Sequence, residues 1–190
     1  MSRPASSRSR SRTPALTLPA VLSFLGTTAR HQRLSRAWTL ELLAERSGLD
    51  VRHVQLIEAG AANVTLATLL RLANGLGVTM PELIEPARAA AAAPPAAAPV
   101  RRRDIDAGRA CSERVQRSRL GRDLSQEQLA HKAGLSLGAI QAVESGRKSP
   151  TLRTLGAIAG ALGVPAWELL TPYDDEQAPA LKKKPRAGRK

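Results

Sequence analysis

The sequence predicts an all-α protein made of two tandem five-helix domains joined by an Ala/Pro linker. The first observation is an internal repeat. The segment that begins at Thr39 aligns without a gap onto the segment that begins at Ser125, with 19 identities over 48 positions. The second is that apolar residues within each copy recur three or four positions apart, between Gly, Pro and Ser/Thr breaks. Because this spacing is typical of helices with one buried face, we predict one helical domain per copy.

The predicted domains, called copy one and copy two below, cover residues 20–86 and 104–172. Three segments of biased composition lie outside them. Residues 1–14 are rich in Ser, Arg and Pro and are expected to form a disordered basic arm. Residues 87–103 form an Ala/Pro/Arg linker, and residues 173–190 are expected to form a disordered basic tail.

Copy one is predicted to begin with a long helix over 21–36. Four shorter helices follow it, at 40–46, 51–58, 66–76 and 80–84. The unit is small, so these helices have to pack tightly to be stable.

Polar caps and glycines mark the helix boundaries of copy two. Ser125 is a candidate N-cap, Gly134 a candidate left-handed C-cap, and Ser136 a candidate N-cap for a helix over 137–144. A fourth helix follows with apolar residues at helical spacing. Pro165 can then occupy the first turn of a fifth helix.

The charge of the chain indicates a polyanionic partner. The sequence holds 29 Lys and Arg against 16 Asp and Glu, a formal net charge of +13. Such an excess attracts nucleic acid, because each phosphate that is neutralised releases condensed counterions. An anionic membrane surface ranks second, although we expect no membrane-spanning segment. Aromatic residues make up only 2% of the chain, which disfavours binding of single strands by base stacking.

Several classes of site lack the residues they need. Cys111 is the only cysteine, so an internal disulfide is excluded, and the three histidines lack metal-ligand spacing. We find no Ser/His/Asp, paired-carboxylate or phosphate-loop pattern at workable spacing. The sequence therefore predicts no enzyme, no metal, no cofactor and no small-molecule ligand, and a cytoplasmic setting.

Each copy also contains two helices joined by a Gly-containing turn. Ala44 and Ala130 are small where two helices would cross closely, and Gly48 and Gly134 suit a turn at positive φ. Ile140 would anchor the following helix so that its outer face could enter a major groove.

This pattern resembles the phage-repressor and Cro-like (XRE-type) helix-turn-helix family of bacteria. In copy two the motif reads LSQEQLA, GLS and IQAVESGRKSPTL between Leu124 and Leu152, and the resemblance covers roughly 25–86 and 108–172. It implies two lambda-repressor-like domains that bind double-stranded DNA, usually as a two-fold pair, and that repress or activate transcription. A repressor-type regulator associated with the nucleoid is the resulting expectation.

The resemblance also implies which residues contact DNA. In copy two, Gln126 would contact a phosphate from the beginning of the second helix. The stretch after the third helix would add phosphate contacts from Ser145, Arg147 and Lys148. Positions that face the bases in this copy are Ser136, Leu137, Gly138 and Gln141. In copy one the corresponding readers are Arg52 and His53. The pairs Arg33 with Glu58 and Arg119 with Glu144 match the family's structural ion pair.

The two copies differ in their suitability for DNA. Residues 15–86 carry six Arg and six acidic residues, whereas residues 100–172 carry twelve Lys and Arg and seven acidic residues. Copy two therefore has the phosphate-binding groups but few base readers, while copy one has Arg52 without the cations to hold it in place. Two hypotheses stay open. Either both copies engage one duplex, or copy one binds a protein partner (an antitoxin-like or adaptor role, or a homodimer) while copy two holds DNA.

Overall fold

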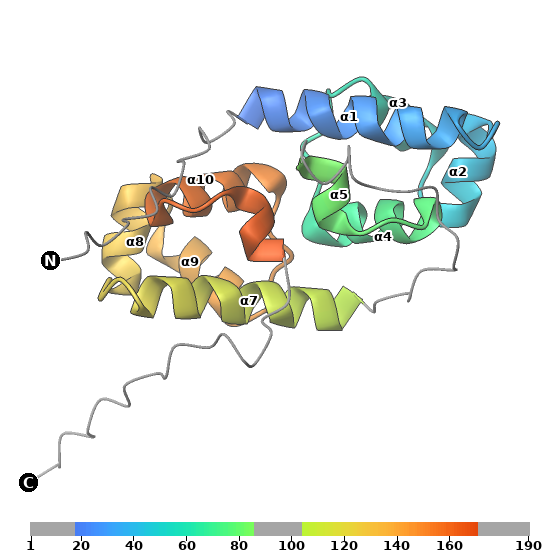
Figure 1. The fold of residues 1–190 in the computed structure, drawn as a ribbon. Helices are drawn as coiled ribbons and strands as arrows, with labels where there is room; N and C mark the ends of the chain where they lie inside the picture. Colours follow the sequence, from blue (N-terminus) through green and yellow to red (C-terminus); the bar gives the residue numbers. More distant parts are fainter. Residues whose placement is uncertain (1–17, 86–103, 171–190) are drawn as a thin grey trace, which may run out of the picture.

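The structure is a computed structural model that describes residues 18–85 and 104–170. The predicted arm 1–14, linker 87–103 and tail 173–190 lie outside the described residues. Figure 1 shows two helical bundles side by side, one for each copy, and the described residues contain helices and no strand. The all-α fold with two tandem domains is therefore confirmed.

Each bundle holds five elements in the order that the repeat predicts. In copy one they are α1 (Leu18–Leu34), α2 (Leu40–Ser47), α3 (Val51–Glu58), α4 (Leu66–Leu76) and α5 (Met80–Ile84). In copy two they are α7 (Asp104–Leu120), α8 (Gln126–Ala133), α9 (Leu137–Glu144), α10 (Leu152–Leu162) and the 3₁₀ helix η1 (Ala166–Leu170).

Local signals set most of these boundaries. Ser125 and Ser136 accept hydrogen bonds from backbone N–H groups of the first turns of α8 and α9. Gly48 and Gly134 end α2 and α8 at φ of 64° and 63°, in the left-handed conformation that glycine adopts without strain. The caps and the Gly turns predicted from the sequence are thus confirmed.

Two elements differ from the prediction. The first helix of copy one begins at Leu18 and not at Val21, and it ends at Leu34 and not at Arg36, because Ala37 turns the chain with φ of 52°. The fifth element of copy two is a 3₁₀ helix where an α-helix was expected. In copy one, Thr79 forms a capping box with Glu82, but the position equivalent to Thr79 in copy two is Pro165, which has no side-chain acceptor.

Equivalent positions fill the two cores. Leu43 and Leu129 are completely buried, as are Leu69 and Leu155. Cys111 is buried at the place that Leu25 occupies in copy one. The same residue positions therefore hold both bundles together, and this packing sets the positions of α3 and α9.

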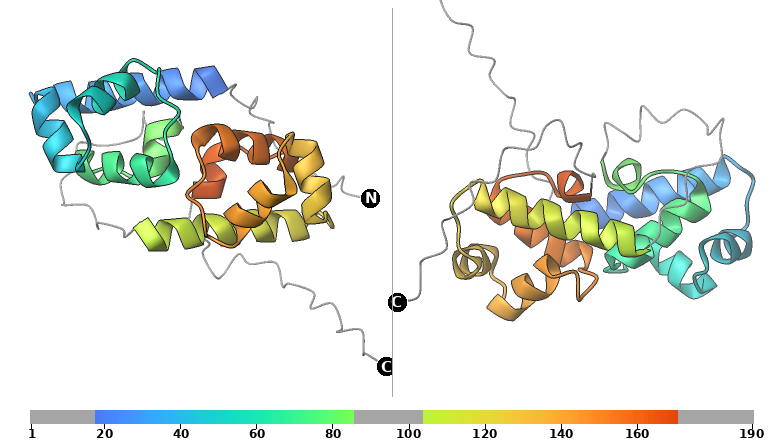
Figure 2. Two further views of the ribbon diagram at one scale, coloured as in Figure 1. Left: turned by 180° about the vertical axis from the view of Figure 1, so that it is seen from behind. Right: turned by 90° about the horizontal axis from the view of Figure 1, so that it is seen from below.

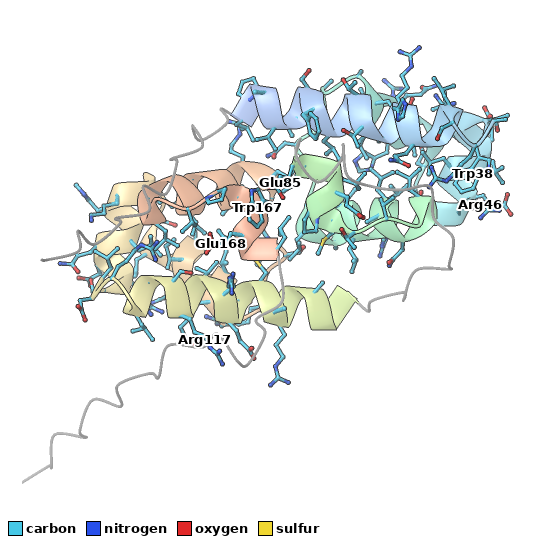
Figure 3. All side chains as sticks on the ribbon, in the orientation of Figure 1. Trp38, Arg46, Glu85, Arg117, Trp167 and Glu168 are labelled. Atoms are coloured by element: carbon cyan, nitrogen blue, oxygen red, sulfur yellow. The ribbon has the colours of Figure 1, made fainter. Side chains whose placement is uncertain are left out.

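The two copies also contact each other directly. Thr65 and Thr151, which immediately precede α4 and α10, form an isolated antiparallel bridge. In addition α4 contacts α7, α1 contacts α10, and α5 contacts η1. Figure 3 labels Glu85 at the end of α5 and Trp167 on η1, at the junction of the two bundles.

Candidate nucleic-acid interface

In copy two, α8 and α9 form the helix-turn-helix, with α9 as its second helix. Ile140 and Val143 lie on the buried side of α9 and pack into the core. Gly138 and Gln141 lie on the opposite side and are exposed, whereas Leu137 is half-buried. The outer face of α9 is therefore small, weakly polar and open to solvent.

The loop after α9 carries the cations of this surface. Ser145, Arg147 and Lys148 are exposed, and Gly146 turns the chain with φ of 69°. The Arg147 Nε donates to the Ser145 Oγ at 2.9 Å, and the Lys148 N–H donates to the Ala142 carbonyl at 3.3 Å. The first bond holds the Arg147 guanidinium and the second fixes the loop backbone at Lys148, so both cationic residues lie beside the C-terminal end of α9.

Gln126 begins α8 and lies half-buried beside the same site. Its Nε2 donates to the Glu144 Oε2 at 2.8 Å. The side chain is thus held in place by the end of α9, which fixes its position next to the exposed loop. The phosphate contact expected for Gln126 remains a prediction.

Both expected ion pairs are present and nearly buried. The Arg119 Nε and Nη2 donate to the two Glu144 carboxylate oxygens at 2.6 and 2.9 Å, and Nη1 donates to the Leu124 carbonyl at 2.8 Å. Arg119 therefore joins the first helix, the following turn and the end of α9. Such bidentate, charge-assisted contacts fix geometry as well as adding energy.

Copy one repeats this arrangement with Arg33 and Glu58. The Arg33 Nε and Nη2 donate to the Glu58 carboxylate at 2.7 and 2.8 Å, and Nη1 donates to the Trp38 carbonyl at 2.9 Å. The hydrogen bonds to Glu58 hold the pKa of Arg33 above its ordinary value. Leu40 stands where copy two has Gln126, so it cannot supply the third contact that Gln126 makes to Glu144.

The outer face of α3 differs from that of α9. Arg52 and Gln55 are exposed and His53 is half-buried. Leu56 lies on the same face and is 44% exposed. The loop after α3 has Ala61 and Ala62 where copy two has its two cations. Copy one therefore has exposed polar groups on α3 without adjacent cations in the loop that follows it.

The second helix of each helix-turn-helix, α3 or α9, is called the recognition helix below. The two recognition helices pack differently against the first helix of their copy, α1 or α7. A Cβ atom added to Gly26 in α1 would lie 2.5 Å from the Ile57 carbonyl oxygen, so α1 and α3 approach closely. The equivalent residue in copy two is Ser112, whose hydroxyl donates to the Val143 carbonyl at 2.7 Å. Contact between backbones in copy one is replaced by a side-chain hydrogen bond in copy two.

A further difference lies at the turn between α1 and α2. Trp38 takes the place that Leu124 has in copy two. The Arg46 guanidinium lies over its ring, 4.3 Å from the ring centroid (Figure 3), and the Arg36 guanidinium lies 5.5 Å from it. The Arg46 contact joins the turn that precedes α2 to the last turn of that helix.

The sequence prediction missed some residues of this region. Gln55 is exposed on α3 at the position of Gln141 on α9, and the repeat offset alone could have identified it. Asn63 and Ser149 accept backbone hydrogen bonds across the junction of the two copies. Their pairing had no signal in hydrophobic periodicity, because both lie in loops.

The described residues lack a metal-binding cluster, a reactive thiol and a membrane-spanning helix. Residues 18–85 and 104–170 contain no group of three or more His, Cys, Asp or Glu that could hold a metal ion. Burial raises the pKa of the Cys111 thiol to about 12, which keeps it protonated and unreactive. Within the same ranges, none of the helices has the length and apolar character needed to cross a bilayer.

Both recognition helices lie on one side of the molecule. Seen from behind, α3 and α9 each lie in front of the first helix of their copy (Figure 2, left). Seen from below, the α2–α3 and α8–α9 pairs project to the same side (Figure 2, right).

Known proteins match at the level of these domains. The chain is 37% identical over 67 residues to the HTH-type transcriptional regulator SutR of Escherichia coli, over 35% of this chain and 38% of that protein. It is 41% identical over 59 residues to an uncharacterized HTH-type transcriptional regulator of Sinorhizobium fredii, over 31% of this chain and 77% of that protein. An immunity repressor protein of Bacillus phage phi105 is 46% identical over 52 residues, over 27% of this chain and 36% of that protein.

The chain thus covers well under half of the length of two of these relatives. No solved structure matches the sequence significantly. A family model described as helix-turn-helix matches twice, at residues 30–83 and 115–168, which together make up more than half of the chain. These two matches fall on the bundles in which α2–α3 and α8–α9 form the paired helices, and the chain belongs to the XRE-type helix-turn-helix family.

Proposed function

We propose that this protein is a double-stranded DNA-binding transcriptional regulator in which copy two is the main DNA anchor. The observation that carries the proposal is the surface formed by α9 and the Ser145–Ser149 loop. It combines an exposed helix face with two exposed cations, Arg147 and Lys148, at the end of that helix. Phosphate contacts position a recognition helix, so the copy with these cations is the one that holds the duplex.

The geometry around Glu144 supports this role. Glu144 accepts hydrogen bonds from Arg119 and Gln126 and thereby ties the end of α9 to the first helix and to the start of α8. A recognition helix whose end is tied to two other helices keeps its outer face in one orientation, which a groove requires. We assign the base contacts of this copy to Ser136, Leu137, Gly138 and Gln141.

We further propose that regulation is of the repressor type. The support is similarity to a phage protein named as an immunity repressor. A reporter gene placed behind a bound sequence tests this point, because a repressor lowers its expression and an activator raises it.

A second candidate function is a DNA-tethered interaction module in which copy one binds a protein. The absence of cations in the loop after α3 favours it, because this loop offers little for phosphate, and exposed Leu56 supplies one apolar contact for a protein. Under this alternative, Leu56→Glu abolishes binding of the protein partner and leaves the affinity for duplex DNA unchanged.

Fluorescence anisotropy of the full chain with several unrelated duplexes tests the main proposal. Arg147→Gln with Lys148→Gln should weaken binding to every duplex by a similar factor, about tenfold or more at moderate salt. The matched control exchanges the two cations, Arg147→Lys with Lys148→Arg, and keeps the charge. If the Gln variant binds as tightly as the wild type, copy two is not the anchor.

A further inference from the structure

The two copies pair with each other through equivalent residues. Thr65 and Thr151, which form the antiparallel bridge, occupy the same position in the two copies. The Leu66 N–H donates to the Pro150 carbonyl at 2.7 Å, and the equivalent Leu152 N–H donates to the equivalent Val64 carbonyl at 2.9 Å. A contact in which each residue meets its own equivalent is the signature of a two-fold axis.

Side-chain bonds follow the same symmetry. The Ala67 N–H donates to the Ser149 Oγ at 3.0 Å, and the Arg153 N–H donates to the Asn63 Oδ1 at 3.2 Å. These four residues are again equivalent in pairs. The junction therefore consists of two symmetry-related sets of bonds at the N-terminal ends of α4 and α10.

One chain thus contains a two-fold pair of domains. The groups that would pair with a second chain are already used inside the first, since the Leu66 and Leu152 N–H groups donate within the chain. The same pairing places α3 and α9 on one side of the molecule (Figure 2). A single duplex lying along that side would meet both helices.

The paired helices carry different reading groups. On α9 the exposed positions are Gly138 and Gln141, with Leu137 half-buried. Leu137 can contact a thymine methyl group and Gln141 can bind the N6 and N7 atoms of adenine, so this face favours A·T pairs. On α3 the position equivalent to Gly138 is Arg52, which is exposed and has the geometry to bind the O6 and N7 atoms of guanine. The two halves of a duplex bound by this surface would differ.

We propose that one chain binds one continuous DNA site that is not palindromic. Copy two reads a half containing A·T pairs, and copy one reads a half containing guanine. The proposal rests on duplex binding by copy two and adds a second, unlike half-site read by copy one. In this proposal α3 binds duplex DNA, whereas in the second candidate function copy one binds a protein.

Selection of bound duplexes from a random pool, with the full chain, tests the proposal. Gln55 and Gln141 provide a matched pair, since the same exposed residue stands at equivalent positions on α3 and α9. We expect the wild type to select two unlike half-sites at a fixed spacing, with one chain per duplex by native mass spectrometry. Gln55→Ala should relax base preference in one half and Gln141→Ala in the other, each by about tenfold.

Three results would count against it. A single half-site that is unaffected by Gln55→Ala or Arg52→Ala would show that copy two binds alone, and the proposed function would stand. A palindrome bound by two chains would also overturn the unlike half-sites. No enrichment and no binding to any duplex would remove the proposed function as well.

A disulfide across the junction tests the pairing itself. Thr65 and Thr151 form a non-hydrogen-bonded antiparallel pair, whose Cα atoms lie about 4.5 Å apart, within the range that a disulfide spans. The variant Thr65→Cys/Thr151→Cys, oxidised, should run as a cross-linked monomer and bind the selected duplex as tightly as its own reduced form. An affinity loss of about tenfold on oxidation, or a cross-link between chains, would overturn the proposal.

Discussion

Copy one and copy two have the same fold and nearly the same core, yet their outward faces have diverged. Leu43 and Leu129 occupy one core position, and Leu69 and Leu155 another, all with no exposed surface. The loop after the recognition helix, in contrast, holds Ala61 and Ala62 in copy one and Arg147 and Lys148 in copy two. Packing of the core constrains the first group of positions, whereas the second group lies in a loop outside the buried core.

The two copies also differ in how the first helix contacts the recognition helix. Gly26 removes the side chain, so that α1 lies against the carbonyl groups at the end of α3. Ser112 keeps a side chain and uses its hydroxyl to bind the equivalent carbonyl, that of Val143. Close backbone packing in copy one and a buried hydrogen bond in copy two therefore hold α3 and α9 against the first helix of their copy.

The largest effect should come from breaking the ion pairs. Removing one partner leaves a nearly buried charge, so Arg33→Leu and Arg119→Leu should each lower the free energy of unfolding by about 3–5 kcal/mol. Glu144 keeps its bond from Gln126, so the loss in copy two should be smaller by about 1 kcal/mol. Urea unfolding of single-tryptophan variants measures this, with Trp38 reporting copy one and Trp167 copy two.

A third variant sharpens this prediction. Gln126→Leu gives copy two the residue that copy one has at Leu40. In that background, Arg119→Leu should cost as much as Arg33→Leu. Equal losses in the original background would mean that the Gln126 bond contributes nothing to the stability of copy two.

The next largest effect on stability should come from the contact between the first helix and the recognition helix of each copy. Gly26→Ala places a Cβ atom 2.5 Å and 2.7 Å from two backbone oxygens, so α1 has to move, at a cost of about 1–3 kcal/mol. Ser112→Ala in copy two removes one hydrogen bond and should cost about 1 kcal/mol. The same urea unfolding measures both variants. An unchanged stability of Gly26→Ala would show that the close approach of α1 and α3 is not required.

The smallest effect concerns the thiol. Cys111 fills the core position of Leu25, and burial raises its pKa to about 12. We therefore expect no reaction with a chromogenic disulfide reagent at pH 8 in the folded state, and rapid reaction in urea. Cys111→Val should change the stability by less than about 1.5 kcal/mol. Fast reaction of the folded chain would show that this core position opens to solvent.

Much of the fold could be predicted because it depends on local chemistry. The boundaries of α3, α4, α5 and α9 follow from capping residues and from apolar spacing, both of which lie within a few residues of each helix end. The arginine–glutamate pairs followed from the family resemblance. The end of α1 and the 3₁₀ form of η1 were missed, because they depend on a left-handed Ala37 and on the loss of a cap at Pro165.

The junction between the copies could not be predicted. Two of its bonds join backbone groups around Thr65 and Thr151, and such groups are the same in every sequence. The other two are accepted by loop side chains, those of Asn63 and Ser149, which carry no periodic signal. The bond from Gln126 to Glu144 was missed for a related reason, since it joins residues 18 positions apart whose side chains meet only in the folded bundle. What was predicted of the DNA-binding residues came from the family resemblance and from charge.

The salt dependence of duplex binding tests the central difference between the copies most directly. For the wild type, the logarithm of the association constant should fall steeply and linearly with the logarithm of the salt concentration. If each of the two cations neutralises one phosphate, as we propose, Arg147→Gln with Lys148→Gln should make that slope shallower by about 2. A slope that is the same in the wild type and in this variant would contradict the assignment of the DNA anchor to copy two.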